Sequence, residues 1–180
     1  AVNAVAEKLD RVHDKPGGLR QLVLGGPNRI GATSRRYTLG ALCDRDPHVV
    51  EAHALVRELE DRKVWEVGNE VQYWSRTNER WIDDIVEARR EKNGAFVYDL
   101  RRRKDTPGER IRVRPEALES ARRAEAKERV LAEDRVLGST DVVLCTLSSS
   151  HLLGELKEEG RIRGRVFLAI LDEAAQTAET

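Results

Sequence analysis

Residues 166–176 read VFLAILDEAAQ, an unbroken apolar run followed at once by two acids. A second apolar run, DVVLCT at residues 141–146, ends in a hydroxyl residue. Because apolar and polar residues do not alternate within them, both runs predict strands that are buried on both faces, as in a parallel sheet covered by helices. Such sheets carry their chemistry at the carboxyl ends of the strands. We therefore expect an α/β fold whose functional residues follow these two runs.

The two acids, Asp172 and Glu173, suit two different roles. At a strand end in a P-loop ATPase, an acid holds Mg²⁺ and a neighbouring glutamate polarises the attacking water. Two acids can instead begin a helix, where they lie near the positive end of its dipole. Residues 172–176 taken alone leave both interpretations open.

Three motifs together resemble the superfamily 1 helicases of the up-frameshift, senataxin and immunoglobulin-mu-binding type. Residues 172–176, DEAAQ, are similar to the Walker B motif of that family. Residues 141–148, DVVLCTLS, resemble its upstream strand motif, which ends in a threonine that contacts nucleic acid. Residues 1–9, AVNAVAEKL, resemble the helix after its motif Ia, with Asn3 in place of the usual aspartate.

This resemblance covers residues 1–61 and 115–180, and it implies part of a RecA-like P-loop NTPase domain that uses ATP and Mg²⁺. It implies that Asp172 coordinates Mg²⁺ through water and that Glu173 is the catalytic base. It also implies that Gln176 links nucleotide and nucleic acid, so that all three side chains contribute to nucleotide binding.

The resemblance further implies that Thr146 and Ser148 contact the sugar–phosphate backbone of single-stranded RNA or DNA. The phosphate-binding loop with the pattern Gly-x-x-x-x-Gly-Lys-Thr does not occur in the sequence. Methionine is absent as well, and residues 176–180 carry no helix end signal. We therefore expect an interior fragment, with the phosphate loop upstream and the second RecA-like domain downstream.

The middle of the chain has a different composition. Residues 62–114 hold 14 basic and 10 acidic residues and six of the eight aromatics. Strand patterns and one hairpin turn are predicted at 67–74, 81–88, Asn93-Gly94, 95–100 and 111–113. Residues 105–108 are expected to be a loop. These short strands predict a small inserted barrel, which resembles the SH3-like and Tudor-like barrels.

The aromatic residues of this module have two interpretations. They can form a cage that binds a methylated ligand or a peptide, or they can fill the core of the barrel, which we favour. The residues concerned are Tyr73, Trp74, Trp81, Phe96 and Tyr98. Likewise, the basic run Arg101–Lys104 either binds phosphates or is a solvated loop.

The flanks of the module predict helices and one strand. Helices are expected at 1–13, 47–62 and 115–137, and a short strand at 19–24. Asp46 is the predicted N-cap of the second helix, and residues 148–151 are expected to be a polar loop. The predicted domains are 1–61 (a RecA-like segment and the first arm helix), 62–114 (the barrel), and 115–180 (the second arm helix and the segment to Walker B).

Composition narrows the class of protein. No apolar run approaches the length of about 20 residues that crosses a bilayer, so we expect no membrane partner. Cys43 and Cys145 lie far apart in unlike sequence contexts, so they suggest neither a disulfide nor a zinc site. We therefore expect a reducing compartment, the cytoplasm or the nucleus. The predicted function is an ATP-dependent DNA or RNA helicase. The alternative is a non-enzymatic adaptor, in which a degenerate RecA-like remnant displays a binding barrel.

Overall fold

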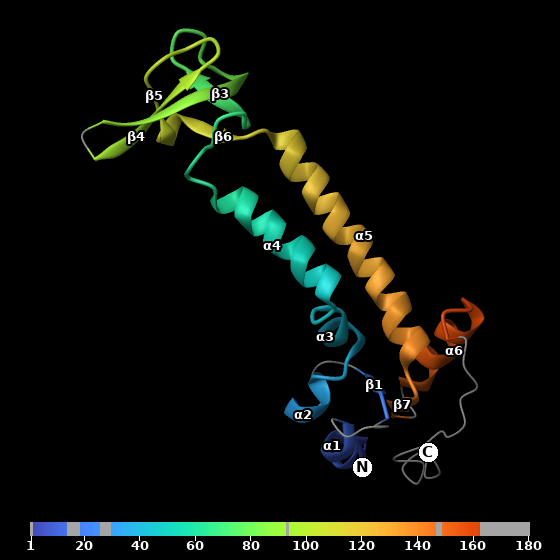
Figure 1. The fold of residues 1–180 in the computed structure, drawn as a ribbon. Coiled ribbons are helices and arrows are strands. Elements are labelled where there is room, and N and C mark those ends of the chain that lie inside the picture. The colour runs from blue at the N-terminus through green and yellow to red at the C-terminus, as the bar shows by residue number, and fades with distance from the viewer. Residues whose placement is uncertain (1, 14–18, 26–29, 93, 147–148, 163–180) are drawn as a thin grey trace. The chain divides into compact units, whose positions relative to one another are not determined.

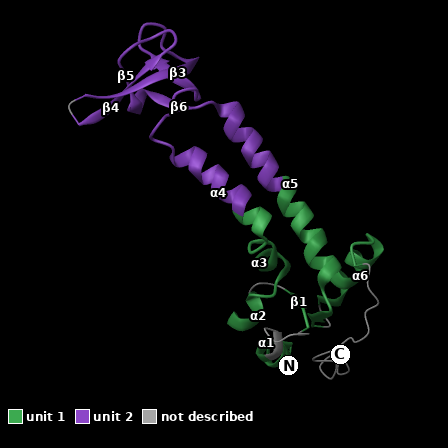
Figure 2. Cartoon of the chain, viewed as in Figure 1, with its two compact units in different colours: residues 1–50, 127–180 green, residues 51–126 purple. Residues whose placement is uncertain are grey.

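The described part of the chain contains helices and two separate sheets. The computed structural model describes residues 2–13, 19–25, 30–92, 94–146 and 149–162 (Figure 1). The chain divides into two compact units (Figure 2). Residues 1–50 and 127–180 form one, which we call the parallel-sheet unit, and residues 51–126 form the other, which we call the five-stranded unit.

The parallel-sheet unit is built around β1 (Gln21–Leu24) and β7 (Val142–Cys145), which pair in parallel. Val23 and Leu144 face one cluster of side chains, which comes largely from α1 (Val2–His13). Leu22, Leu24 and Cys145 face another cluster, on the other side of the pair. The prediction of a parallel strand within residues 141–146 is thus confirmed for Val142–Cys145, with Leu144 and Cys145 buried and Val142 and Val143 half-buried.

Three short helices of this unit did not follow from the sequence. They are α2 (Ala32–Arg35), α3 (Leu39–Cys43) and α6 (Ser150–Glu158). The expectation of a polar loop at 148–151 is wrong at its last two residues, because α6 begins at Ser150. Leu152, Leu153 and Leu156 of α6 pack against the cluster that contains Leu22 and Leu137. The three leucines lie on one face of a helix, and burying that face stabilises the helix despite the polar residues around it.

The two long helices agree with the sequence closely. They are α4 (Pro47–Asp61) and α5 (Pro115–Ser139), and each has one end in each unit. The backbone N–H of His48 donates to Oδ1 of Asp46 at 3.0 Å, which confirms the predicted N-cap. A small buried cluster in the parallel-sheet unit joins the two helices and contains Cys43, Val49 and Ala132.

The five-stranded unit is an antiparallel sheet with the strand order β5-β4-β3-β2-β6. Its elements are β2 (Glu70–Ser75), β3 (Arg80–Lys92), β4 (Ala95–Leu100), β5 (Thr106–Pro107), the 3-10 helix η1 (Gly108–Arg110) and β6 (Ile111–Val113). The long β3 pairs with β2 through its first half and with β4 through its second half. A bulge between Val86 and Ala88 separates the two halves.

One core cluster holds this sheet together. It contains Trp65, Val71, Tyr73, Val86, Tyr98, Leu100 and Ile111. Gly94 adopts φ +74°, as expected of a hairpin turn that favours glycine. The prediction of a loop at 105–108 is wrong for Thr106 and Pro107, because these two residues pair with Tyr98 and Val97 as a short strand. The prediction that residues 62–114 form a domain of their own stays a prediction.

Candidate functional site

Two hydroxyl side chains, Thr146 and Ser149, lie together at the carboxyl end of β7. Thr146 follows the strand directly, and its Oγ1 lies 3.2 Å from Oγ of Ser149, to which it donates. The backbone N–H of Ser149 also donates to the carbonyl oxygen of Thr146 at 3.0 Å. Ser149 is buried, whereas Thr146 is half-buried.

Ser149 lies beside the carboxyl end of β1. A Cβ atom built on Gly25, the residue after β1, would lie 3.7 Å from Oγ of Ser149. Thr146, Ser149 and Gly25 therefore gather at the carboxyl edge of the parallel pair. Hydroxyl and backbone groups at such an edge are suited to hydrogen bonds with sugar and phosphate oxygens, which position a strand without reading its bases.

The other predicted site residues fall outside the described part of the chain. These are Ser148, Asp172, Glu173 and Gln176, so the predicted Mg²⁺ and nucleotide positions have no described geometry. Among the described residues, no group of three or more His, Cys, Asp and Glu side chains is arranged to hold a metal ion.

Asn3 has a structural role that the sequence did not indicate. Its Oδ1 accepts a hydrogen bond from the backbone N–H of Gly31 at 3.0 Å. A Cβ atom on Gly31 would lie 3.1 Å from the Asn3 side chain, so any larger residue there would push against that side chain. Asn3 thereby ties α1 to the residue that precedes α2. No local sequence pattern signals a pair of residues this far apart.

The aromatic residues of the five-stranded unit divide into two groups. Tyr73 and Tyr98 lie in the core together with Trp65, as the core interpretation predicts. Trp74 and Phe96 are exposed, with 36% and 43% of their surface accessible. These two therefore do not help to fill the core.

The indole rings of Trp74 and Trp81 lie opposite each other on β2 and β3, edge to face with centroids 5.6 Å apart. The guanidinium of Arg112 lies 4.0 Å from the centroid of Trp81. Two hydrogen bonds from Arg112 to Oε1 of Gln72, at 3.0 and 2.8 Å, hold it there. A cation of the protein itself thus occupies the position that a methylated ligand would take on Trp81.

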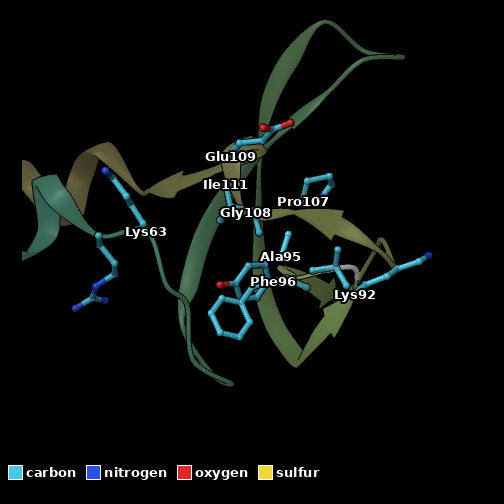
Figure 3. Close-up of a pocket in the computed structure, with 11 residues that line it drawn as sticks. Lys63, Lys92, Ala95, Phe96, Pro107, Gly108, Glu109 and Ile111 are labelled. Carbon is cyan, nitrogen blue, oxygen red and sulfur yellow. The ribbon is translucent and has the colours of Figure 1, made fainter.

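A groove of about 680 Å³ lies on another part of the five-stranded unit. Figure 3 shows Lys63, Phe96 and Lys92 among its lining side chains. Three cations, Arg62, Lys63 and Lys92, and one acid, Glu109, line it, so the groove is positively charged. Such a lining fits an extended or anionic ligand better than a cationic one.

Gly108 and Tyr98 both line the groove and lie close together. A Cβ atom on Gly108 would lie 3.1 Å from Cε2 of Tyr98, closer than most neighbouring side chains allow. Phe96 forms part of the wall, and the guanidinium of Arg89 lies 5.0 Å from its ring centroid. Phe96 is a candidate cage residue by sequence, but no sequence pattern predicted the groove.

Two side chains of the basic run Arg101–Lys104 have different neighbours. Nε of Arg101 lies 3.8 Å from a carboxylate oxygen of Glu87. The guanidinium of Arg103 instead lies over the ring of Tyr73, 6.0 Å from its centroid.

The two cysteines are buried, and burial raises the pKa of the Cys43 and Cys145 thiols, which disfavours reactive thiolates.

Comparisons with protein-family models, with curated proteins and with solved structures found no match for the chain. No helix in the described ranges combines the length and the apolar character that crossing a membrane requires. Any assignment of function therefore rests on the residues themselves.

Proposed function

We propose that the chain is part of an ATP-dependent nucleic-acid helicase, which couples ATP hydrolysis to movement on single-stranded RNA or DNA. The observation that carries this proposal is the parallel pair β1–β7, buried on both faces, with Thr146 and Ser149 at its carboxyl edge. In open α/β sheets, ligands bind at that edge.

The chain connectivity supports the proposal. The chain leaves the parallel-sheet unit through α4, forms the five-stranded unit, and returns through α5 to β7. Neighbouring strands of one parallel sheet are thus separated by a whole inserted module. This is the organisation that the helicase resemblance predicts for residues 1–61 and 115–180.

In this proposal, the residues that carry out ATP hydrolysis are those that the resemblance to the helicases implies. Asp172 would hold Mg²⁺ through water, and the metal would neutralise charge on the ATP phosphates. Glu173 would accept a proton from the attacking water. Gln176 would couple the bound nucleotide to the strand, and Thr146 with Ser148 would contact the strand itself.

We further propose that the five-stranded unit is an SH3-like or Tudor-like barrel. Its strand order, the long β3 shared by two halves of the sheet, and the 3-10 helix η1 before the last strand all support this fold. The unit would then serve as a binding module carried by the helicase.

ATP hydrolysis by the full-length protein, measured with and without single-stranded RNA and DNA, tests the helicase proposal. We expect hydrolysis that the strand stimulates. Replacing Thr146 with valine keeps the shape and removes the hydroxyl, so the strand concentration needed for half stimulation should rise about tenfold. Thr140→Val is the control, because the Thr140 hydroxyl bonds only to the carbonyl of Val136 within the described contacts. Hydrolysis that no strand stimulates would contradict the proposal.

A second candidate function is a non-enzymatic adaptor, and the groove lined by Lys63, Phe96 and Lys92 favours it. In that case the full-length protein would bind a ligand at the groove and hydrolyse no ATP. The same hydrolysis assay therefore separates the two functions.

A further inference from the structure

The groove on the five-stranded unit lies where the chain leaves the sheet. β5 pairs only with Val97 and Tyr98 of β4, and the chain then turns into η1. Ala95 and Phe96, the first two residues of β4, therefore have no strand beyond them on that side within the described part of the chain. Both residues line the groove. The groove thus includes an unpaired edge of β4.

Phe96 extends the core face of β4 into the groove. Because side chains alternate between the two faces of a strand, Phe96 points to the same face as Tyr98 and Leu100. Tyr98 and Leu100 are buried in the core cluster, whereas Phe96 is 43% exposed. Pro107 and Ile111 add to the apolar part of the lining. The groove therefore presents apolar surface that the unit itself leaves uncovered.

Two of the three cations that line the groove have no acidic partner. Lys63 and Lys92 form no ion pair among the residues that the structure describes, whereas Arg62 pairs with Glu58. Of the described lining residues, only Glu109 is acidic. Figure 3 shows Lys63 and Lys92 on opposite sides of Phe96. Positive charge therefore flanks the exposed apolar surface on two sides.

We propose that this groove binds a short acidic segment of a protein partner in an extended conformation. An extended peptide can add to an unpaired strand edge through main-chain hydrogen bonds. An apolar side chain of the peptide would cover Phe96, and acidic side chains before and after it would lie near Lys63 and Lys92. The volume of about 680 Å³ is within the range of roughly 300–1,000 Å³ that suits a small ligand or a few side chains.

A single-stranded nucleic acid is also anionic but fits the groove less well. Proteins that bind single strands use several exposed aromatic rings, on which successive bases stack. Phe96 is the one exposed ring among the described lining residues, because Tyr98 is fully buried. The guanidinium of Arg89 lies over that ring, 5.0 Å from its centroid, and so covers one of its faces. The apolar lining and the unpaired strand edge favour a peptide.

This inference does not depend on the proposed ATP hydrolysis. Every described residue that lines the groove belongs to the five-stranded unit. A chain that hydrolyses no ATP can still bind the peptide, and a helicase can lack peptide binding. The two proposals therefore fail independently of each other.

Fluorescence anisotropy with the 180-residue chain tests the proposal. The probe is a fluorescein-labelled peptide of about ten residues, with leucine and phenylalanine at its centre and glutamates on both sides. We expect a dissociation constant below roughly 0.1 mM, which rises with salt concentration because exposed ion pairs are screened. A peptide with serines at its centre should bind about tenfold more weakly. A peptide with lysines in place of the glutamates should not bind measurably.

Variants of the groove locate the binding. Phe96→Ala removes the exposed apolar side chain and should weaken the binding of the glutamate peptide about tenfold. The double variant Lys63→Gln with Lys92→Gln should also weaken it about tenfold and should flatten its dependence on salt. All three side chains are exposed, so these changes leave the core in place. Amide NMR spectra of each variant check the fold.

Matched changes outside the groove are the controls. Trp74→Ala removes an exposed aromatic ring from β2. The double variant Lys104→Gln with Arg122→Gln removes two exposed positive charges from the same unit. Both controls should bind the glutamate peptide with wild-type affinity.

The proposal is supported if binding requires both the acidic and the apolar residues of the peptide and only the groove variants weaken it. It is overturned if the glutamate peptide does not bind, if the lysine peptide binds equally well, or if the groove variants bind as the controls do. A fluorescent oligothymidylate is titrated in the same way. If it binds more tightly than the glutamate peptide and the groove variants weaken it, the groove belongs to a nucleic-acid strand and the proposal is overturned as well.

Discussion

Arg135 holds the carboxylate of Asp46 through two hydrogen bonds, from Nε to Oδ2 at 2.9 Å and from Nη2 to Oδ1 at 2.8 Å. The same carboxylate caps α4 through the backbone N–H of His48. The Asp46 side chain is only 11% exposed. One half-buried side chain thus ties the start of α4 to α5 within the parallel-sheet unit.

Asp46→Ala should therefore lower the free energy of unfolding by roughly 2 kcal/mol, because it removes both the helix cap and the partner of Arg135. Asp44→Ala is the matched control. Asp44 is 60% exposed and pairs with Arg129, so its replacement should cost about 0.5 kcal/mol. Urea denaturation followed by circular dichroism measures both. Equal losses of stability in the two variants would show that Asp46 contributes no more than an exposed ion pair.

Stability should also depend on pH through Asp46. The hydrogen bonds from Arg135 hold the pKa of Asp46 below its ordinary value. The stabilisation is present above the unfolded pKa of about 4 and is lost as the pH falls through the lower folded pKa. The stability advantage of the wild type over Asp46→Asn should therefore shrink below about pH 4. Denaturation of both proteins between about pH 7 and pH 3 measures it, and a constant difference would contradict the assignment.

The parts of the fold that the sequence predicted correctly depend on local patterns. The apolar run 141–146 indicated a buried strand, Asp46-Pro47 indicated the start of a helix, and Gly94 indicated a hairpin turn. Each signal arises within a few neighbouring residues. For that reason it could be recognised without knowing the rest of the fold.

The parts that the sequence did not predict depend on distant contacts. The two-residue strand β5 is too short to show a period of alternation and exists because it pairs with β4. Asn3 meets Gly31, and Arg103 meets Tyr73, only in the folded chain. Among the candidate site residues, Thr146 was predicted correctly as the residue after a buried strand, whereas Ser149 beside it was not singled out.

The contact between Arg112 and Trp81 should contribute to stability. Arg112→Ala removes a cation from the face of the indole and two hydrogen bonds to Gln72. The expected cost is roughly 1–2 kcal/mol. Arg112→Lys keeps the charge without the paired hydrogen bonds and should cost about half as much. Thermal denaturation followed by tryptophan fluorescence measures both losses. An unchanged midpoint in Arg112→Ala would show that the contact does not contribute to stability.

The five-stranded sheet should fold without the rest of the chain. Its core cluster is drawn entirely from residues 65–111. We expect residues 62–114, expressed alone, to give well-dispersed amide NMR spectra. Tyr98→Ala in the same segment is the control, because emptying that fully buried position should cost roughly 3–5 kcal/mol and abolish the dispersion. Poor dispersion of the unmodified segment would contradict a self-contained module.

Glu173→Gln in the full-length protein tests the central claim, that this chain belongs to an ATP-driven helicase. The change keeps the shape of the side chain and removes the charge that would accept a proton from water. ATP and Mg²⁺ should still bind, whereas strand-stimulated hydrolysis should fall by roughly two orders of magnitude or more, as expected when a general base is removed. Asp172→Asn should instead weaken the metal-dependent binding of nucleotide. Nucleotide binding and hydrolysis are measured side by side for both variants. Wild-type hydrolysis by Glu173→Gln would contradict the Walker B assignment and leave Asp172 and Glu173 as acids at the start of a helix.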